Sequence, residues 1–184
     1  MKPKFKIIKG DLTELKVDVI VNPSNKYLTC GSGLSGIIFK KAGIKELSEE
    51  LNKIKKDGPF YNGLIPGLCV VSKAYNLPQK YIIHTLSPNN LEYKNLNIDV
   101  KNQGIKDILK QAHLNTLDEA EALNCETIAF PILGIGNFGI DIKISINVIQ
   151  EIIDEYESNV LKKIYFVFYD ENIYLIYNKQ LKLT

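Results

Sequence analysis

Two short glycine-rich stretches are the residues of this sequence best suited to chemistry. Residues 30–36 read CGSGLSG and residues 134–139 read GIGNFG, so glycines recur at the spacing G-x-G-x-x-G in both. Glycine lets the backbone approach an anion without an intervening Cβ, and free N–H groups ahead of a helix bind phosphate oxygens. One such loop could hold one phosphate. Two loops in one chain predict a site for a diphosphate.

The same spacing occurs in Rossmann folds that bind NAD, but the context here differs. In those folds the first glycine follows the first strand at once, and an acidic residue about 20 positions later binds a ribose. Here NPSNKYLT separates the strand from the glycines, and the later region reads NKIKKDG, a helix end. Either loop alone could be an ordinary turn. Together they favour an anion site and leave an NAD-dependent oxidoreductase as the least supported class.

Hydrophobic patterns predict the elements that must position these loops. Short β-rich runs predict strands over residues 5–9, 17–21, 67–75, 80–86, 127–131 and 163–169. Apolar residues at helical spacing predict helices over residues 36–43, 44–54, 100–123, 142–156 and 171–182, with Asp141 as an N-cap. This alternation predicts an α/β fold, a three-layer α/β/α sandwich around a mixed, largely parallel sheet. Its ligand is expected beyond the carboxyl ends of the strands.

Length and composition are those of an ordinary globular domain. The 184 residues are 45% hydrophobic and 24% charged, and the longest apolar runs, such as VIV and YFVFY, fall far short of the ~20 residues of a membrane span. The opening MKPKFKIIKGD lacks the apolar segment of a signal peptide. We therefore expect a single cytoplasmic domain over residues 1–184 that does not associate with membranes.

Metal binding and nonspecific nucleic-acid binding have little support. The three cysteines, Cys30, Cys69 and Cys125, lie far apart without a C-x-x-C pair, and only His84 and His113 could assist them. The net charge of +2 supplies no concentrated basic face. We expect no metal and no cofactor, although a single bound anion remains compatible with this charge.

Three spaced motifs resemble those of macrodomains, the ADP-ribose-binding modules. Residues 10–43, GDLTELKVDVIVNPSNKYLTCGSGLSGIIFKKAG, resemble that family's N-terminal signature of G-D-[IL]-T, V-N-A-A-N, a glycine loop and a helix ending in A-G. NLPQKYIIHTLSP and IAFPILGIGNFGID are similar to two later family motifs and occur in the same order. The resemblance covers nearly the whole chain and implies the macrodomain fold.

The resemblance also implies how the adenine end of ADP-ribose would be held. Asp11 would accept a hydrogen bond from the adenine amino group, with the Leu12 backbone beside it, and Tyr169 would stack on the base. Asp11 has a plain alternative as a turn residue that caps Thr13 or Glu14. Tyr169 has core packing as its alternative.

The distal end of the ligand would be held by residues of both loops. Asn25 would hold the distal ribose, Phe138 would cover it, and Asn22 is expected to brace the loop. The resemblance assigns the diphosphate to Gly31, Ser32, Gly33 and Leu34 of the first loop and to Gly134, Ile135, Gly136, Asn137 and Phe138 of the second. His84 matches a structural histidine of the family, and Cys30 is a loop residue because no histidine base lies near it in sequence.

One departure from the family bears on catalysis. Family hydrolases often begin the helix after the first loop with V-D-G, where this chain has Leu34, Ser35 and Gly36. A serine hydroxyl can position water but cannot act as a carboxylate base at neutral pH. The catalytic candidates are therefore Asn25, Ser35 and Phe138, acting by positioning.

The resemblance implies a mono-ADP-ribosyl hydrolase that acts on modified acidic side chains or on small ADP-ribose esters. The alternative is a noncatalytic reader that binds ADP-ribose without turnover. The expected partners are ADP-ribose or an ADP-ribosylated protein, with ADP-ribosylated nucleic acid as a further option, and the expected state is a monomer. Residues needed for the lysine-dependent and paired-glutamate mechanisms of other macrodomains are missing at the matching positions.

Overall fold

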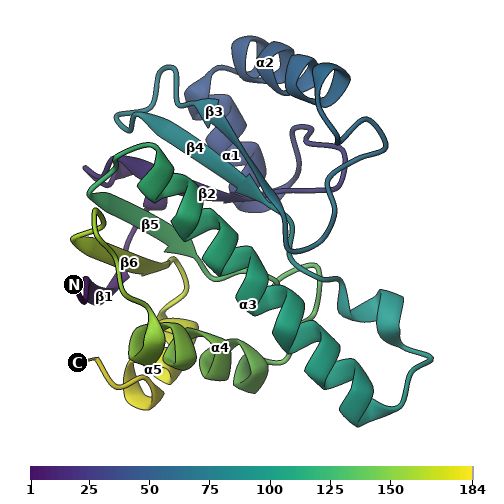
Figure 1. The fold of residues 1–184 in the computed structure, drawn as a ribbon, viewed down its shortest axis with the longest axis vertical. Helices are drawn as coiled ribbons and strands as arrows, with labels where there is room; N and C mark the ends of the chain where they lie inside the picture. Colours follow the sequence, from purple (N-terminus) through teal and green to yellow (C-terminus); the bar gives the residue numbers. More distant parts are fainter. Residues whose placement is uncertain (184) are drawn as a thin grey trace.

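The computed structural model describes residues 1–183 (Figure 1). Its elements, in chain order, are β1 (Lys4–Lys9), η1 (Leu12–Glu14), β2 (Val19–Pro23), α1 (Gly33–Ala42), α2 (Ile44–Asp57), β3 (Cys69–Lys73), β4 (Tyr81–Thr85), η2 (Asn90–Tyr93), α3 (Ile98–Ala122), β5 (Thr127–Pro131), α4 (Ile142–Glu155), β6 (Lys163–Phe168) and α5 (Glu171–Gln180). No helix within residues 1–183 has both the length and the hydropathy needed to cross a bilayer.

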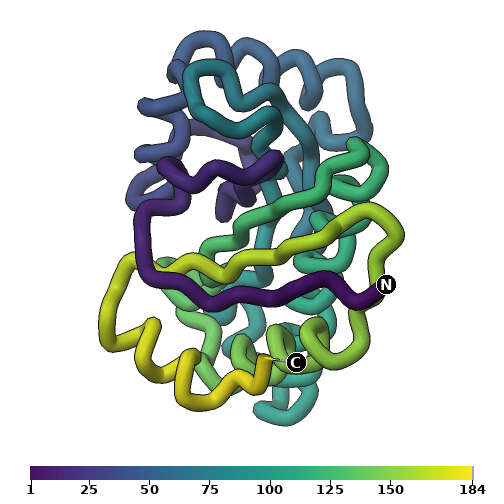
Figure 2. The backbone as a smooth tube through the Cα atoms, turned by 90° about the vertical axis from the view of Figure 1, so that its left-hand side faces the viewer, coloured from purple at the N-terminus to yellow at the C-terminus, as the bar shows by residue number. Residues whose placement is uncertain are grey.

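The strands form one six-stranded sheet in the order β1-β6-β5-β2-β4-β3. Every neighbouring pair is parallel except β3 and β4, which are antiparallel. The first and last strands lie side by side, with Lys4 opposite Lys163 and Lys9 opposite Phe168 (Figure 2). The mixed, largely parallel sheet predicted from the sequence is confirmed.

The middle of the sheet is where its connections change direction. The chain leaves β2 for α1 on one face, and it leaves β5 for α4 on the other. β2 pairs with β5 through only two residues, Val19 and Ile20, whereas it pairs with β4 along all five. In open α/β sheets such a switch point forms the crevice that binds ligands.

Helices cover both faces of the sheet. On one face Ile38 and Phe39 of α1 and Leu47 of α2 are buried with Ile20 and Ile82 of the sheet. The strand residues alternate between faces, so their neighbours along the chain serve the opposite core.

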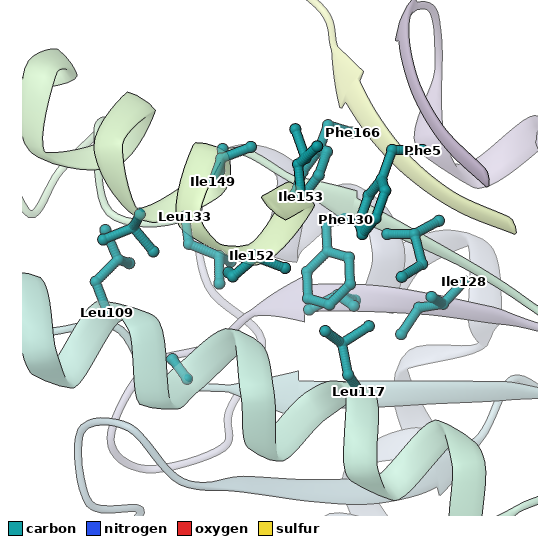
Figure 3. Packing of buried hydrophobic residues seen from close by; sticks show 14 of the residues in the cluster. Phe5, Leu109, Leu117, Ile128, Phe130, Leu133, Ile149, Ile152, Ile153 and Phe166 are labelled. Atoms are coloured by element: carbon teal, nitrogen blue, oxygen red, sulfur yellow. The ribbon is translucent and has the colours of Figure 1, made fainter. Parts of the chain in front are cut away.

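On the other face α3, α4 and α5 pack on the strands. Phe130 lies between Leu117 of α3 and Ile153 of α4 (Figure 3), and its ring centroid is 5.8 Å from that of Phe166. Tyr177 of α5 packs against Phe168 with a centroid distance of 4.9 Å. The three-layer sandwich is thereby confirmed.

Some boundaries differ from the sequence expectation. β2 begins at Val19 rather than at position 17, because the Asp18 carboxylate accepts hydrogen bonds from the backbone N–H groups of Glu126 and Thr127, 3.0 Å away, at the start of β5. α1 begins at Gly33, three residues earlier than expected, so half of the first glycine loop is a helical turn. The turn η1 has Asp11 as its N-cap, which was one of the two alternatives for Asp11, whereas the turn η2 was not expected.

Candidate functional site

Two adjoining cavities open at the carboxyl ends of the strands. The loop cavity, about 460 Å³, is lined by the residues that follow β2 and β5. The tyrosine cavity, about 760 Å³, is lined by the residues that follow β1 and β6. Gly33, Leu34, Pro131, Ile132 and Gly136 line both cavities, so the two form one continuous site.

Every site residue expected from the sequence lines one of these cavities. The loop cavity contains Asn25, Gly31, Ser32, Gly33, Leu34, Ser35, Gly134, Gly136, Asn137 and Phe138. The tyrosine cavity contains Asp11, Leu12, Ile135 and Tyr169 and shares three residues of the loops. Of the expected residues of the second loop, Ile135 alone lines the tyrosine cavity without also lining the loop cavity.

Tyr169 follows the last residue of β6 and is 89% exposed. The core-packing alternative for Tyr169 is thus wrong, since the neighbouring Phe166 and Phe168 fill the core. The register of β1 against β6 explains the grouping: Lys9 lies opposite Phe168, so Asp11 and Tyr169 emerge from adjacent strands. A large ring is left free at the edge of an apolar cavity.

Asp11 is the N-cap of the turn η1, in agreement with the alternative that it is a turn residue capping Thr13. Its Oδ1 accepts hydrogen bonds from the Thr13 backbone N–H at 2.9 Å and from the Thr13 hydroxyl at 2.6 Å. Its Oδ2 lies 3.1 Å from the Nζ of Lys41. Burial acts to raise the pKa of Asp11, but the hydrogen bonds from Thr13 and Lys41 outweigh it and leave the pKa lowered. The carboxylate stays charged at neutral pH and still borders the cavity.

The first glycine loop runs into the N-terminus of α1. Ser32 is the N-cap of α1, yet its side chain makes no capping hydrogen bond. Gly33 adopts φ = 57°, a left-handed conformation that favours glycine. The first N–H groups of α1 have no partner within the helix and carry the positive end of its dipole, which suits an anion.

Ser35 lies in the first turn of α1 and lines the loop cavity. The residue is only 6% exposed, and its hydroxyl has no hydrogen-bond partner within residues 1–183. A buried hydroxyl without a partner is costly unless a ligand or water satisfies it. The Ser35 hydroxyl is therefore suited to hydrogen-bond a ligand or a water molecule in the loop cavity.

Asn25 lines the loop cavity, where the distal ribose was expected, and the structure adds a second role for it. Asn25 braces its own loop, because its Oδ1 accepts hydrogen bonds from the N–H groups of Tyr27 and Thr29 while its Nδ2 donates to the Thr29 carbonyl at 2.8 Å. Asn22 was expected to do this, and that expectation is wrong. Asn22 is buried within β2, and its Nδ2 lies 2.9 Å from the Nδ1 of His84 on β4.

His84 is a structural residue, as the family resemblance implied. Its Nε2 lies 2.8 Å from the Ser72 hydroxyl, and complete burial lowers its pKa to about 3. The ring is therefore neutral, with Nδ1 accepting from Asn22 and Nε2–H donating to Ser72. It does not line either cavity.

Residues outside the expected site also shape it. The backbone N–H of Asn90 donates to the Phe138 carbonyl at 3.0 Å, and its Nδ2 donates to the Gly139 carbonyl at 2.9 Å, so η2 holds the second loop. Ser24 and Ser87 line the loop cavity. The local signal for Ser24 and Ser87 was that they lie within two residues of the ends of β2 and β4. Within residues 1–183, no group of three or more His, Cys, Asp or Glu could hold a metal ion.

Comparison with known proteins identifies relatives over most of the chain. The family model described as Macro domain matches residues 21–149. A macro domain-containing protein of Caldanaerobacter subterraneus is 33% identical, with 97% of this chain and 96% of that protein covered. A protein of Escherichia fergusonii named O-acetyl-ADP-ribose deacetylase is 34% identical, with 98% and 97% covered.

Solved structures agree with these relatives. The Oceanobacillus iheyensis macrodomain with ADP superposes with a TM-score of 0.84 at 26% identity, covering 97% of this chain and 90% of that one. A Trypanosoma brucei macrodomain in complex with ADP-ribose has a TM-score of 0.74 at 24% identity, covering 96% and 68%, and it supports the fold alone.

Proposed function

This chain belongs to the macrodomain family, and on that premise we propose that it binds ADP-ribose and hydrolyses it from modified acidic side chains or from small ADP-ribose esters. The observation that carries the proposal is the continuity of the two cavities: an exposed tyrosine and a carboxylate at one end, two glycine loops at the other. The relative named O-acetyl-ADP-ribose deacetylase supports the hydrolytic part.

The tyrosine cavity suits the adenine base. The exposed ring of Tyr169 can stack on the base, and Asp11 can accept the hydrogen bond of its amino group. The Leu12 backbone lies beside Asp11, and Ile37 and Ile173 add apolar surface. In our proposal the adenine therefore lies at the ends of β1 and β6.

The diphosphate then falls where the two cavities meet. Gly33, Leu34 and Gly136 line both cavities, and they come from the two glycine loops. Gly134 and Ile135 of the second loop have no side-chain donors, so in our proposal backbone N–H groups supply the phosphate contacts. The distal ribose occupies the loop cavity beside Asn25 and Phe138.

The loop cavity constrains the chemistry because no titratable side chain lines it. Its residues are Pro23, Ser24, Asn25, Gly31, Ser32, Gly33, Leu34, Ser35, Ser87, Pro131, Ile132, Gly134, Gly136, Asn137 and Phe138. In our proposal Ser35 and Asn25 position a water beside the anomeric carbon. The water oxygen forms a bond to that carbon as the carboxylate of the modified side chain leaves, and the proton passes to the ligand phosphate or to solvent.

A carboxylate is a good leaving group, so the reaction needs no general acid. It also lacks a general base, whose help is typically worth ~10²- to 10⁴-fold, and turnover should be slow. The second candidate function, a reader that binds ADP-ribose without turnover, is favoured by the serine at position 35. For both functions we propose a single cytoplasmic domain that is a monomer. Its partner would be an ADP-ribosylated protein, an ADP-ribosylated nucleic acid or a free ester.

Calorimetry with ADP-ribose, ADP, AMP and NAD tests the binding proposal. ADP-ribose should bind with micromolar affinity, about −7 to −9 kcal/mol, and NAD more weakly because its nicotinamide must enter the distal ribose site. Equal affinities for ADP-ribose and NAD would overturn this site assignment. Release of ADP-ribose from an aspartate- or glutamate-modified protein then distinguishes hydrolase from reader, and tight binding with no release over hours would leave the reader.

A further inference from the structure

Lys41 lies in the last turn of α1, the helix whose first turn forms the diphosphate loop. Its ammonium contacts three acceptors on η1 and its cap: Asp11 Oδ2 at 3.1 Å, Thr13 Oγ1 at 2.8 Å and Glu14 Oε1 at 2.5 Å. An ammonium has three N–H donors. All three are therefore used on these acceptors, and none is left for a ligand. Lys41 is not among the residues that line either cavity.

The contacts of Lys41 reach both oxygens of the Asp11 carboxylate. Oδ2 is held directly by the ammonium, and Oδ1 is held by the Thr13 hydroxyl, which itself accepts from Lys41. Thr13 is buried, so its hydroxyl is fixed in place. This closed set of hydrogen bonds opposes rotation of the carboxyl group, whose terminal torsion is otherwise broad.

The same contacts determine which acceptor positions remain. Oδ1 already receives two hydrogen bonds from Thr13, through its backbone N–H and its hydroxyl. Oδ2 receives one, from Lys41. Since a carboxylate oxygen accepts about two hydrogen bonds, one position on Oδ2 is left. A base that offers a donor there is accepted, whereas a base that offers an oxygen meets negative charge.

We propose that Lys41 is a positioning residue for base selectivity: it orients the Asp11 carboxylate so that Oδ2 accepts from a 6-amino purine and rejects a 6-oxo purine. This inference rests on the proposed binding of ADP-ribose. The contact is made through Asp11, not by Lys41 itself. The location of Lys41 on α1 also ties the base end of the site to the helix that carries the diphosphate loop.

Lys41→Met tests the proposal, because methionine keeps an unbranched side chain and removes the ammonium. The matched control is Lys40→Met, which changes an exposed neighbouring lysine in the same helical turn. Affinities are measured by calorimetry for ADP-ribose and for its hypoxanthine analogue, with thermal melting to verify folding. The informative quantity is the ratio of the two affinities.

We expect Lys41→Met to lower that ratio by about 3- to 10-fold, the scale of a partly exposed ion pair combined with a charge-assisted hydrogen bond. Lys40→Met should leave the ratio unchanged, and Lys41→Arg should retain most of it. If Lys41→Met does not fold, Thr13→Val removes the hydroxyl link to Oδ1 and should lower the ratio in the same direction.

An equal loss of affinity for both ligands would overturn the proposal, because it would show that Lys41 only attracts an anionic ligand. An unchanged ratio would overturn it as well, as would a wild-type protein that binds both ligands equally. Failure of the wild type to bind ADP-ribose at all would instead refute the proposed function.

Discussion

Gly36 lies so close to Gly31 that a Cβ at position 36 would stand 2.5 Å from the Gly31 carbonyl oxygen. Real Cβ atoms do not approach a backbone oxygen this closely, and a backbone oxygen cannot swing aside as a side chain can. Gly36 is in the first turns of α1, and Gly31 begins the loop that lines the cavity. The shape of the first loop therefore requires glycine, which has no Cβ, at position 36.

Gly36→Ala should displace the first loop and weaken ADP-ribose binding at least tenfold, because the backbone donors would move away from the diphosphate. Gly104→Ala is the matched control: it is also a helical glycine, but a Cβ there would meet nothing within 4 Å. That change should stabilise the protein by about 0.5–1 kcal/mol and leave binding unchanged. Calorimetry and chemical denaturation of both variants check the pair, and undiminished binding by Gly36→Ala would contradict the loop assignment.

Tyr169→Ala should weaken ADP-ribose binding by about 1–3 kcal/mol, the usual contribution of stacking between a base and an aromatic side chain. Stability should not change, since the ring is 89% exposed. Tyr61→Ala serves as control, because Tyr61 is 78% exposed and does not line either cavity. Equal affinities for the two variants would remove Tyr169 from the adenine site.

Ser35→Asp should raise hydrolysis at least tenfold by supplying the carboxylate base that the loop cavity lacks. Single-turnover release of ADP-ribose from a modified protein measures the effect, with binding measured in parallel. The wild-type rate should be flat between about pH 5.5 and 7.5, since no side chain lining the loop cavity titrates there. The rate of the variant should instead fall as its new carboxyl group is protonated. If the variant binds ADP-ribose normally but hydrolyses no faster than the wild type, a carboxylate at position 35 does not act as a base.

Asn90→Ala should weaken ADP-ribose binding several-fold and leave ADP binding nearly unchanged. The variant loses the hydrogen bond from Nδ2 to the Gly139 carbonyl, next to Phe138, which lines the loop cavity where we propose that the distal ribose binds. ADP has no distal ribose and should not report the change. A matched loss for both ligands would show that Asn90 supports the whole loop rather than its distal end.

Stability should fall on acidification because of two buried histidines. Burial lowers the pKa of His84 to about 3 and that of His113 to about 4, from 6.5 when unfolded. Between pH 6.5 and 4 the unfolded chain binds these protons while the native protein does not, so the free energy of unfolding decreases as the pH falls through this window. From pH 6.5 to 5 each histidine should lower the free energy of unfolding by about 1–2 kcal/mol.

His113→Phe isolates part of this effect. The His113 ring stacks on Phe130 with centroids 5.3 Å apart, and its Nε2 has no partner within residues 1–183, so phenylalanine suits the position. The variant should show a shallower loss of melting temperature between pH 7 and 5 than the wild type. An equal slope would mean that other groups cause the acid sensitivity.

Local patterns were sufficient to predict much of the fold. The helix α4 was expected from the spacing of its isoleucines and from its cap, and Asp141 does accept from the Lys143 backbone N–H at 2.7 Å. β6 was expected as an apolar run covered on both faces. These features depend on neighbours in the chain, which a single sequence displays.

Features that depend on distant residues were missed or misplaced. The start of β2 is set by Asp18, whose partners lie more than 100 positions later. Lys41 acts on Asp11, 30 positions away, and Asn90 acts on Gly139, 49 positions away. Motif resemblance selected the residues that line the site, because a motif records tertiary contacts indirectly. It carried no information on the side chains that hold them.

The pairing of β1 with β6 also bears on how the protein is made. Within residues 1–183, β1 lies at the edge of the sheet with β6 as its one partner strand, and Lys4 lies opposite Lys163, which is 163 − 4 = 159 positions later. β2 and β4 meet across a shorter separation, with Val19 opposite Tyr81, 81 − 19 = 62 positions apart. Closing a longer loop costs more conformational entropy. The N-terminal residues also leave the ribosome first, so β1 emerges long before β6. The β1–β6 pair should therefore form late. We therefore expect the end of the proposed site that holds Asp11 and Tyr169 to be incomplete on a nascent chain, so that the nucleotide would stabilise the protein only after residue 169 has left the ribosome.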